Sequence, residues 1–311
     1  MNAMQNAFNA VGCILLLGSV GAGAYLLGLL RDEHLPLLSA LVIKVALPAM
    51  IVCNLLEQYT PEMLLANVPA LVASFASIAL TMLLAMPVGK LLRLPGERLG
   101  VFVVMFSFSN SVFIGVPVSR ALFGEAVLPY TLLYYIANTS MFWALGYLLM
   151  RKCGGTAGPG KRQGPPIPLA VLAVCVVLVF LRVSLPRFFM DACGYIGDLV
   201  TPLSLIFTGA VIARMARARA FRWEKGYAAL LIGRFILCPA LLLLCALPFD
   251  VPEMTRNALL VQAGMPVMAS TSLVAASTGS DEEYAASGTA LTTVLSLLMI
   301  PVYMFFIERV L

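Results

Sequence analysis

Long apolar runs, separated by short charged or Pro/Gly-rich stretches, follow one another along the whole 311-residue chain. A helix that crosses a bilayer needs roughly 20 mostly apolar residues, and the pattern divides into ten runs of about this length. They lie at about 8–30, 35–57, 64–89, 99–122, 127–150, 167–187, 192–213, 226–248, 256–278 and 284–308. The sequence therefore predicts an all-α integral membrane protein with ten transmembrane helices.

Composition supports a membrane protein over a soluble one. Hydrophobic residues make up 61% of the chain and charged residues 11%, whereas soluble domains carry about 25% charged residues. The first apolar run has no preceding Lys or Arg, so we interpret it as a span and not as a cleavable signal peptide. The seven cysteines form no C-x-x-C pair and are interpreted as small core residues. Neither a metal site nor a cofactor is expected.

The distribution of basic residues predicts the orientation, because Lys and Arg are retained on the cytoplasmic side of short loops. The loops after odd-numbered spans hold Arg31, Lys90, Arg93, Arg98, Arg151, Lys152, Lys161, Arg162, Arg214, Arg217, Arg219, Arg222 and Lys225. The opposite face holds only Arg182, Arg187, Arg256 and Arg309. We therefore expect a cell-membrane protein with both termini extracytoplasmic. The net charge of +5 then requires no nucleic-acid partner, although the basic face can contact anionic lipids.

The two halves of the chain carry matching interruptions. Residues 151–166, rich in Gly, Pro and basic residues, predict a cytoplasmic linker between residues 1–150 and 167–311. Each half holds five predicted spans, and an odd number means that the halves insert upside down relative to one another. Gly115-Val-Pro117 and Gly264-Met-Pro266 lie in the fourth and ninth spans. We predict two inverted five-helix repeats whose broken helices 4 and 9 cross near the bilayer midplane, as in many transporters.

The residues around these interruptions resemble the auxin efflux carrier family, in particular its small bacterial members. The resemblance covers essentially the whole chain and is closest at residues 101–150 and 260–305; it rests on Asn110-Ser-Val-Phe-Ile-Gly-Val-Pro117, Ala121-Leu-Phe-Gly-Glu125, Tyr134, Asn138, Trp143, Met265-Pro266, Gly279-Ser-Asp281, Thr293-Val-Leu-Ser296 and Pro301. It implies a ten-helix fold like that of sodium/proton antiporters and bile acid symporters, with a scaffold part and a core part. Substrates of similar proteins are organic anions such as auxin, malate or malonate. The long cytoplasmic loop of the plant carriers is absent here.

The chemistry of the interruptions suits a small carboxylate. Half-helix N-termini carry partial positive charge and free N–H groups, so they can hold an anion without a buried cation. Amides and hydroxyls cluster in the same segments. The predicted substrate-binding residues are Asn54, Asn110, Ser111, Gly115, Pro117, Asn138, Gln262, Gly264, Pro266 and Thr271. The alternative for any single polar side chain is a hydrogen bond across packed helices, which is common in membranes.

Ionisable residues deep in the spans are candidates for coupling. Lys44 and Asp198 each stand four residues before a proline, Pro48 and Pro202. Inversion places them on opposite sides of the midplane, roughly 10 Å or more apart at 1.5 Å per residue, so we do not expect them to pair. Asp198 is a candidate proton acceptor, with solvation at the interface as the alternative, and snorkelling is the alternative for Lys44. Arg120 and Arg234 fit either anion binding or stabilisation of helix ends.

These observations predict a secondary transporter that moves a small organic anion by alternating access, in the direction of efflux. H⁺ coupling, Na⁺ coupling and uniport all stay open, as does a homodimer. An anion channel and a non-transporting membrane receptor are the alternatives. An intramembrane enzyme is disfavoured because the chain has no HExxH motif and a single histidine, His34, in a connecting segment.

Overall fold

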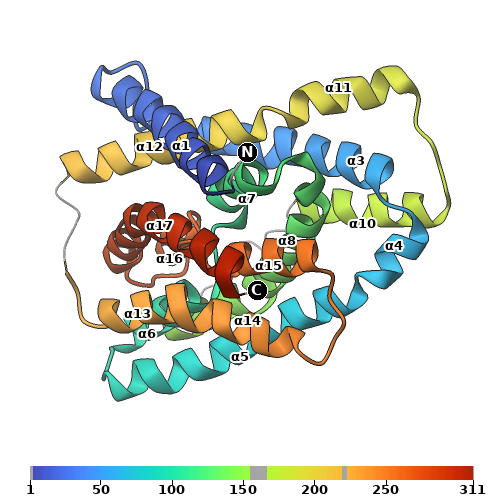
Figure 1. The fold of residues 1–311 in the computed structure, drawn as a ribbon. Helices are drawn as coiled ribbons and strands as arrows, with labels where there is room; N and C mark the ends of the chain where they lie inside the picture. Colours follow the sequence, from blue (N-terminus) through green and yellow to red (C-terminus); the bar gives the residue numbers. More distant parts are fainter. Residues whose placement is uncertain (1–2, 155–166, 219–222, 311) are drawn as a thin grey trace.

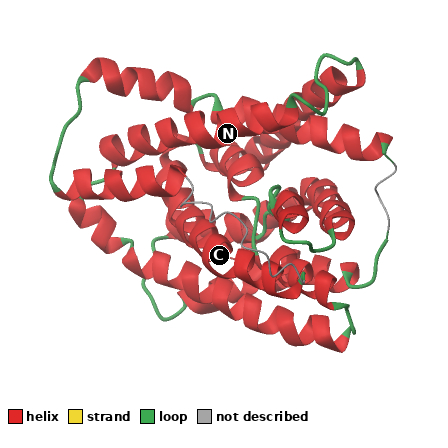
Figure 2. Ribbon diagram, turned by 180° about the vertical axis from the view of Figure 1, so that it is seen from behind, coloured by secondary structure: helices red, strands yellow, loops and turns green. Residues whose placement is uncertain are grey.

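The computed structural model describes residues 3–154, 167–218 and 223–310. Most of the predicted linker, residues 155–166, lies outside the described residues. Helices form almost all of the described part, and its only extended pairing is one isolated bridge between Ser109 and Val267. Figure 2 shows the loops as short connections at the helix ends. The chain therefore has the all-helical architecture that its apolar runs predict.

The helices pack as two bundles, and Figure 1 shows most of the first above and most of the second below the centre of the molecule. The first bundle contains α1 (Ala3–Leu26), α2 (Leu35–Leu41), α3 (Leu47–Gln58), α10 (Ile167–Phe180), α11 (Arg187–Gly197) and α12 (Val200–Arg217). The second bundle contains α4 (Pro61–Ala66), α5 (Val68–Leu91), α6 (Gly96–Ser107), α7 (Val116–Phe123), α8 (Leu128–Met141), α9 (Tyr147–Cys153), α13 (Tyr227–Ile232), α14 (Cys238–Ala246), α15 (Glu253–Ala263), α16 (Thr271–Ser277) and α17 (Glu282–Val310).

Small residues bring α1 and α12 into backbone contact within the first bundle. A Cβ atom built on Gly209 would lie 1.9 Å from the carbonyl oxygen of Gly18, and one on Gly21 would lie 2.0 Å from that of Ile206. No larger side chain fits at either glycine without moving the helices apart. Close approach over small residues is a usual way for membrane helices to associate, because lipid supplies no hydrophobic driving force between them.

Prolines inside the spans are absorbed by widened turns. A proline has no N–H to donate and its ring clashes with the carbonyl four residues earlier, and a turn with i to i−5 bonding relieves both problems. Such π-helical turns end two residues before Pro48, Pro117 and Pro239; they are η1 (Val42–Ala46), η2 (Ser111–Gly115) and η5 (Gly233–Leu237). These helices therefore continue through their prolines.

Six described helices, counted through their internal turns, are long and apolar enough to cross a membrane: Leu35–Glu57, Pro61–Leu91, Glu125–Cys153, Arg187–Arg217, Tyr227–Ala246 and Glu282–Ile307. Shorter apolar helices lie at Gly12–Leu26, Ser111–Phe123 and Ala170–Phe180. Two of the other predicted spans, 99–122 and 256–278, are interrupted, so neither provides a continuous helix of spanning length. The membrane character is confirmed, whereas the count of ten spans and the inverted relation of the halves stay predictions.

The two interruptions do not occupy the same place in their motifs. In the second half, α15 ends at Ala263 and α16 begins at Thr271, so the interruption contains Gly264 and Pro266, as predicted. In the first half the non-helical residues are 108–110, and Gly115 and Pro117 lie in helical backbone. The prediction that the first helix breaks at Gly115-Val-Pro117 is therefore wrong, because the π turn η2 accommodates the proline and no break is needed there.

Candidate functional site

The two interruptions cross and bind each other through their backbones. The N–H of Asn110 donates to the carbonyl of Pro266 at 2.7 Å, and the N–H of Met268 donates to the carbonyl of Phe108 at 3.3 Å. Between them lies the antiparallel bridge from Ser109 to Val267. Backbone that leaves a helix inside a membrane must find other partners, and here each interruption supplies partners to the other.

Asn138 in α8 holds the first interruption from the side. Its Oδ1 accepts the N–H of Ser109 at 3.0 Å and its Nδ2 donates to the carbonyl of the same residue at 2.9 Å. Both residues are fully buried. Nδ2 also lies 3.4 Å from Oγ of Ser111. The amide of Asn138 thus replaces the helical partners that Ser109 has lost, and its contacts position the interruption.

Asn110 is the point where the first interruption meets a cavity. Its Oδ1 accepts the N–H of Phe113 at 3.2 Å and so caps the turn η2. Its backbone carbonyl accepts the N–H of Gly115 at 2.9 Å. Although Asn110 is only 3% exposed, its side chain lines the cavity described below. The capping bond uses only Oδ1, so the Nδ2 group of Asn110 can donate to a ligand.

A buried glutamine joins α15 to α7. Gln262 is fully buried and its Nε2 donates to Oγ of Ser119 at 3.2 Å, while its Oε1 has no partner among the described residues. A Cβ atom on Gly115 would lie 2.2 Å from that Oε1. Gly115 is therefore needed as space for the amide of Gln262. Pro117, the second residue of α7, is also buried.

The second interruption packs against α17. A Cβ atom on Gly264 would lie 2.5 Å from the ring of Tyr303, and the N–H of Val267 donates to Oγ1 of Thr292 at 3.2 Å. Thr271, the first residue of α16, is fully buried, and its hydroxyl has no partner among the described residues. Contacts to α17 thus fix the second interruption just as Asn138 fixes the first.

One buried arginine serves both broken helices. Arg234 in η5 is fully buried and donates to the carbonyls of Phe106 at 3.0 Å and Ala263 at 2.5 Å. Those residues lie at the C-terminal ends of α6 and α15, where carbonyls lose their helical partners and carry partial negative charge. Of the two roles that the sequence left open for Arg234, the geometry matches stabilisation of helix ends.

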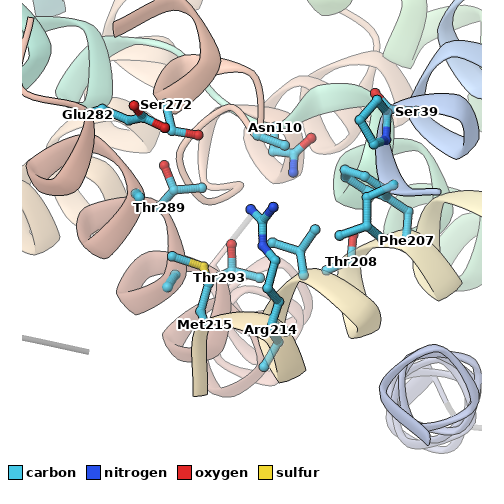
Figure 3. A pocket seen from close by; sticks show the side chains of 17 residues that line it. Ser39, Asn110, Phe207, Thr208, Arg214, Met215, Ser272, Glu282, Thr289 and Thr293 are labelled. Carbon is cyan, nitrogen blue, oxygen red and sulfur yellow. The ribbon is translucent and has the colours of Figure 1, made fainter. Parts of the chain in front are cut away.

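A cavity of about 170 Å³ lies between the two bundles, next to Asn110. Figure 3 shows the polar side chains that border it, and they come from the first interruption and from α2, α12, α16 and α17. They are Ser39, Asn110, Thr208, Arg214, Ser272, Glu282, Thr289 and Thr293. At about 30 Å³ for each water molecule in the liquid, the cavity holds a few waters or one small organic molecule.

The ionisable residues proposed for coupling lie outside this cavity. Asp198, in the turn between α11 and α12, accepts a hydrogen bond from Arg120 of α7 at 2.9 Å, and Arg120 also pairs with Glu125. Lys44 is exposed in η1. Asn54 is buried in α3, where its Nδ2 donates to the carbonyl of Met50 one turn earlier. Among the described residues, the partner of Asp198 is thus Arg120.

Known proteins match the chain along nearly its full length. A family model described as "Membrane transport protein" matches residues 7–163 and 160–304. The chain belongs to this family. A protein named as an uncharacterized transporter in Methanocaldococcus jannaschii is 25% identical over 93% of this chain and 95% of its own length. A second one, in Methanothermobacter thermautotrophicus, is 24% identical over the same shares.

Membership in the membrane transport protein family confirms the resemblance to the auxin efflux carriers and identifies the chain as a membrane transporter and not an enzyme. Of the polar residues that line the cavity, the predicted binding residues include only Asn110, and Arg214 is among those that sequence reasoning missed. Arg214 was counted only among the basic residues that set orientation, yet it lines the cavity beside Asn110. The predicted span ended at residue 213, whereas α12 continues to Arg217 and so carries Arg214 in its last turn.

Proposed function

We propose that this transporter is a secondary carrier for a small organic anion and that it works by alternating access. The observation that carries the proposal is the position of the cavity. Its walls come from α2 and α12 on one side and from α16 and α17 on the other, so a rocking motion of one bundle against the other opens or closes it. Asn110, at the crossing of the interruptions, is the proposed substrate-binding residue.

The lining of the cavity favours an anion. Its polar groups are mostly neutral, one amide and several hydroxyls, which can donate to a carboxylate. Its two charged groups are the guanidinium of Arg214 and the carboxylate of Glu282, both at the rim. We propose that Ser111, Gly115, Gln262 and Pro266 shape this site from behind Asn110. Asn138 has the same supporting role, and Thr271 lies beside the cavity residue Ser272.

Efflux from the cell is the proposed direction of transport. In the proposed orientation, both termini of the chain face the exterior of the cell. An inside-negative potential favours the exit of an anion by about 2.3 kcal/mol per charge for every 100 mV. Such a carrier needs no coupling ion. If H⁺ is coupled, Asp198 is the proposed acceptor, because protonation would break its ion pair with Arg120 and so separate α7 from α12.

The test is transport by the purified protein in liposomes. We expect saturable flux of labelled lactate, malonate, malate or indole acetate under an imposed potential, and acceleration of labelled flux by unlabelled substrate on the opposite side. Asn110→Ala should abolish this flux. Asn67→Ala, which changes a buried asparagine in the connection between α4 and α5, should preserve it.

Three results would contradict the proposal. Wild-type flux that neither saturates nor shows counterflow would indicate the alternative, an anion channel, because a channel needs no alternating access. Equal flux in the folded Asn110→Ala and Asn67→Ala variants would remove Asn110 from the site. Binding of an anion with no flux of any kind would indicate a receptor.

A further inference from the structure

Arg214 is an exposed cation at the border of the cavity. It lies in the last turn of α12, and it makes no hydrogen bond or ion pair with any residue in the described part of the chain. Arg214 and Arg217, one turn later, both border a second depression near Arg31 and Asp32, but Arg217 does not line the cavity. The two arginines share a helix and a charge, but only one of them faces the proposed substrate site.

The guanidinium of Arg214 points into the cavity toward Asn110, as Figure 3 shows. The walls between the two side chains carry hydroxyls, from Thr208 on α12 and from Thr289 and Thr293 on α17. Arg214 and Phe207, which also lines the cavity, are seven residues apart on α12. At 1.5 Å per residue the cavity therefore extends about 10 Å inward from Arg214.

The cavity opens at the face that carries most of the basic residues. Its rim is formed by the start of α2, the end of α12 and the start of α17, and the rim residues Arg214 and Glu282 are both exposed. Glu282 is the one other charged residue among those that line the cavity. A ligand that enters from this face thus meets Arg214 before it reaches Asn110.

We propose that Arg214 binds the carboxylate of the transported anion on the basic face of the membrane. A guanidinium matches a carboxylate with two parallel N–H donors, and such charge-assisted pairs are stronger than neutral hydrogen bonds. The remainder of the ligand then lies among hydroxyls and reaches the amide of Asn110. The ligand class is a small carboxylate with an uncharged polar group, such as a hydroxy acid.

This inference rests on the proposed function and adds a sidedness to it. The contact exists only while the cavity is open to the basic face, so Arg214 should govern loading from that face alone. Arg120 in α7 is paired with Asp198 and Glu125 and is not available for the same role.

The experiment measures lactate transport from each face, in inside-out vesicles and in intact cells, for Arg214→Gln and Arg217→Gln. From the basic face we expect Arg214→Gln to raise KM about 10-fold or more, as loss of a charge-assisted pair implies, with kcat nearly unchanged. From the other face its KM should equal that of the wild type, and this equality also shows that the variant is folded. Arg214→Lys, which keeps the charge but loses the fork, should fall between.

Other outcomes overturn the inference. Equal KM values for Arg214→Gln and Arg217→Gln, whether both normal or both raised, would mean that Arg214 acts only through surface charge or not at all. A KM raised equally from both faces would remove the sidedness on which the inference depends. If the wild-type protein moves no carboxylate, the proposed function itself fails, and that result is distinct from normal wild-type flux with an unaffected Arg214→Gln.

Discussion

Loss of the Asn138 amide should destabilise the transporter strongly. The N–H of the buried Ser109 donates to Oδ1 of Asn138 at 3.0 Å and has no other partner among the described residues. Nδ2 of Asn138 donates to the carbonyl of Ser109 at 2.9 Å, and this carbonyl also accepts the N–H of Ser111. A buried polar group left without a partner costs about 1–3 kcal/mol. Asn138→Ala leaves the N–H of Ser109 without a partner, so we expect a loss of about 1–3 kcal/mol in the free energy of unfolding.

The assay is thermal unfolding of the purified protein in detergent. By the scaling for soluble proteins, this loss lowers Tm by roughly 2 °C or more. Asn138→Leu restores the volume but not the hydrogen bonds, so it should be nearly as unstable and thereby separates lost bonds from a cavity. Thr255→Val is the matched control, because that buried hydroxyl has no partner among the described residues. If Asn138→Ala and Asn138→Leu both unfold at the temperature of Thr255→Val, the reasoning is refuted.

Three further changes test the bundles and the cavity. Gly209→Ala places a Cβ atom 1.9 Å from the backbone of α1, so Tm should fall by several degrees, whereas Gly23→Ala meets open space and should leave Tm unchanged. Arg234→Met removes the donors to the ends of α6 and α15, at about 1.5–3 kcal/mol for each bond to a charged group; an unchanged Tm would refute this role. Glu282→Gln removes the acidic group of the cavity rim, and the KM for malonate should fall relative to that for lactate; an unchanged ratio of KM values in vesicle transport would contradict this.

The sequence alone determined the class of the protein and the place of its second interruption. Runs of apolar residues are local features of the sequence. In lipid such a run forms a helix, because a helix satisfies the hydrogen bonds of its own backbone. The same reasoning found Asn110 and Pro266, which the structure joins by a hydrogen bond. It misplaced the first interruption, because whether a proline breaks a helix or is absorbed by a π turn depends on the neighbouring packing.

Only the tertiary structure decided which side chains meet. Arg234 lies 128 residues from Phe106, and Arg120 lies 78 residues from Asp198. No local pattern specifies such pairs, since they follow from how the bundles pack. For the same reason the sequence could not separate Arg214, which faces the cavity, from Arg217 one turn away. Charge and hydropathy placed both arginines at one face of the membrane. The packing of α12 against α17 and α2 decides that Arg214, and not Arg217, lines the cavity.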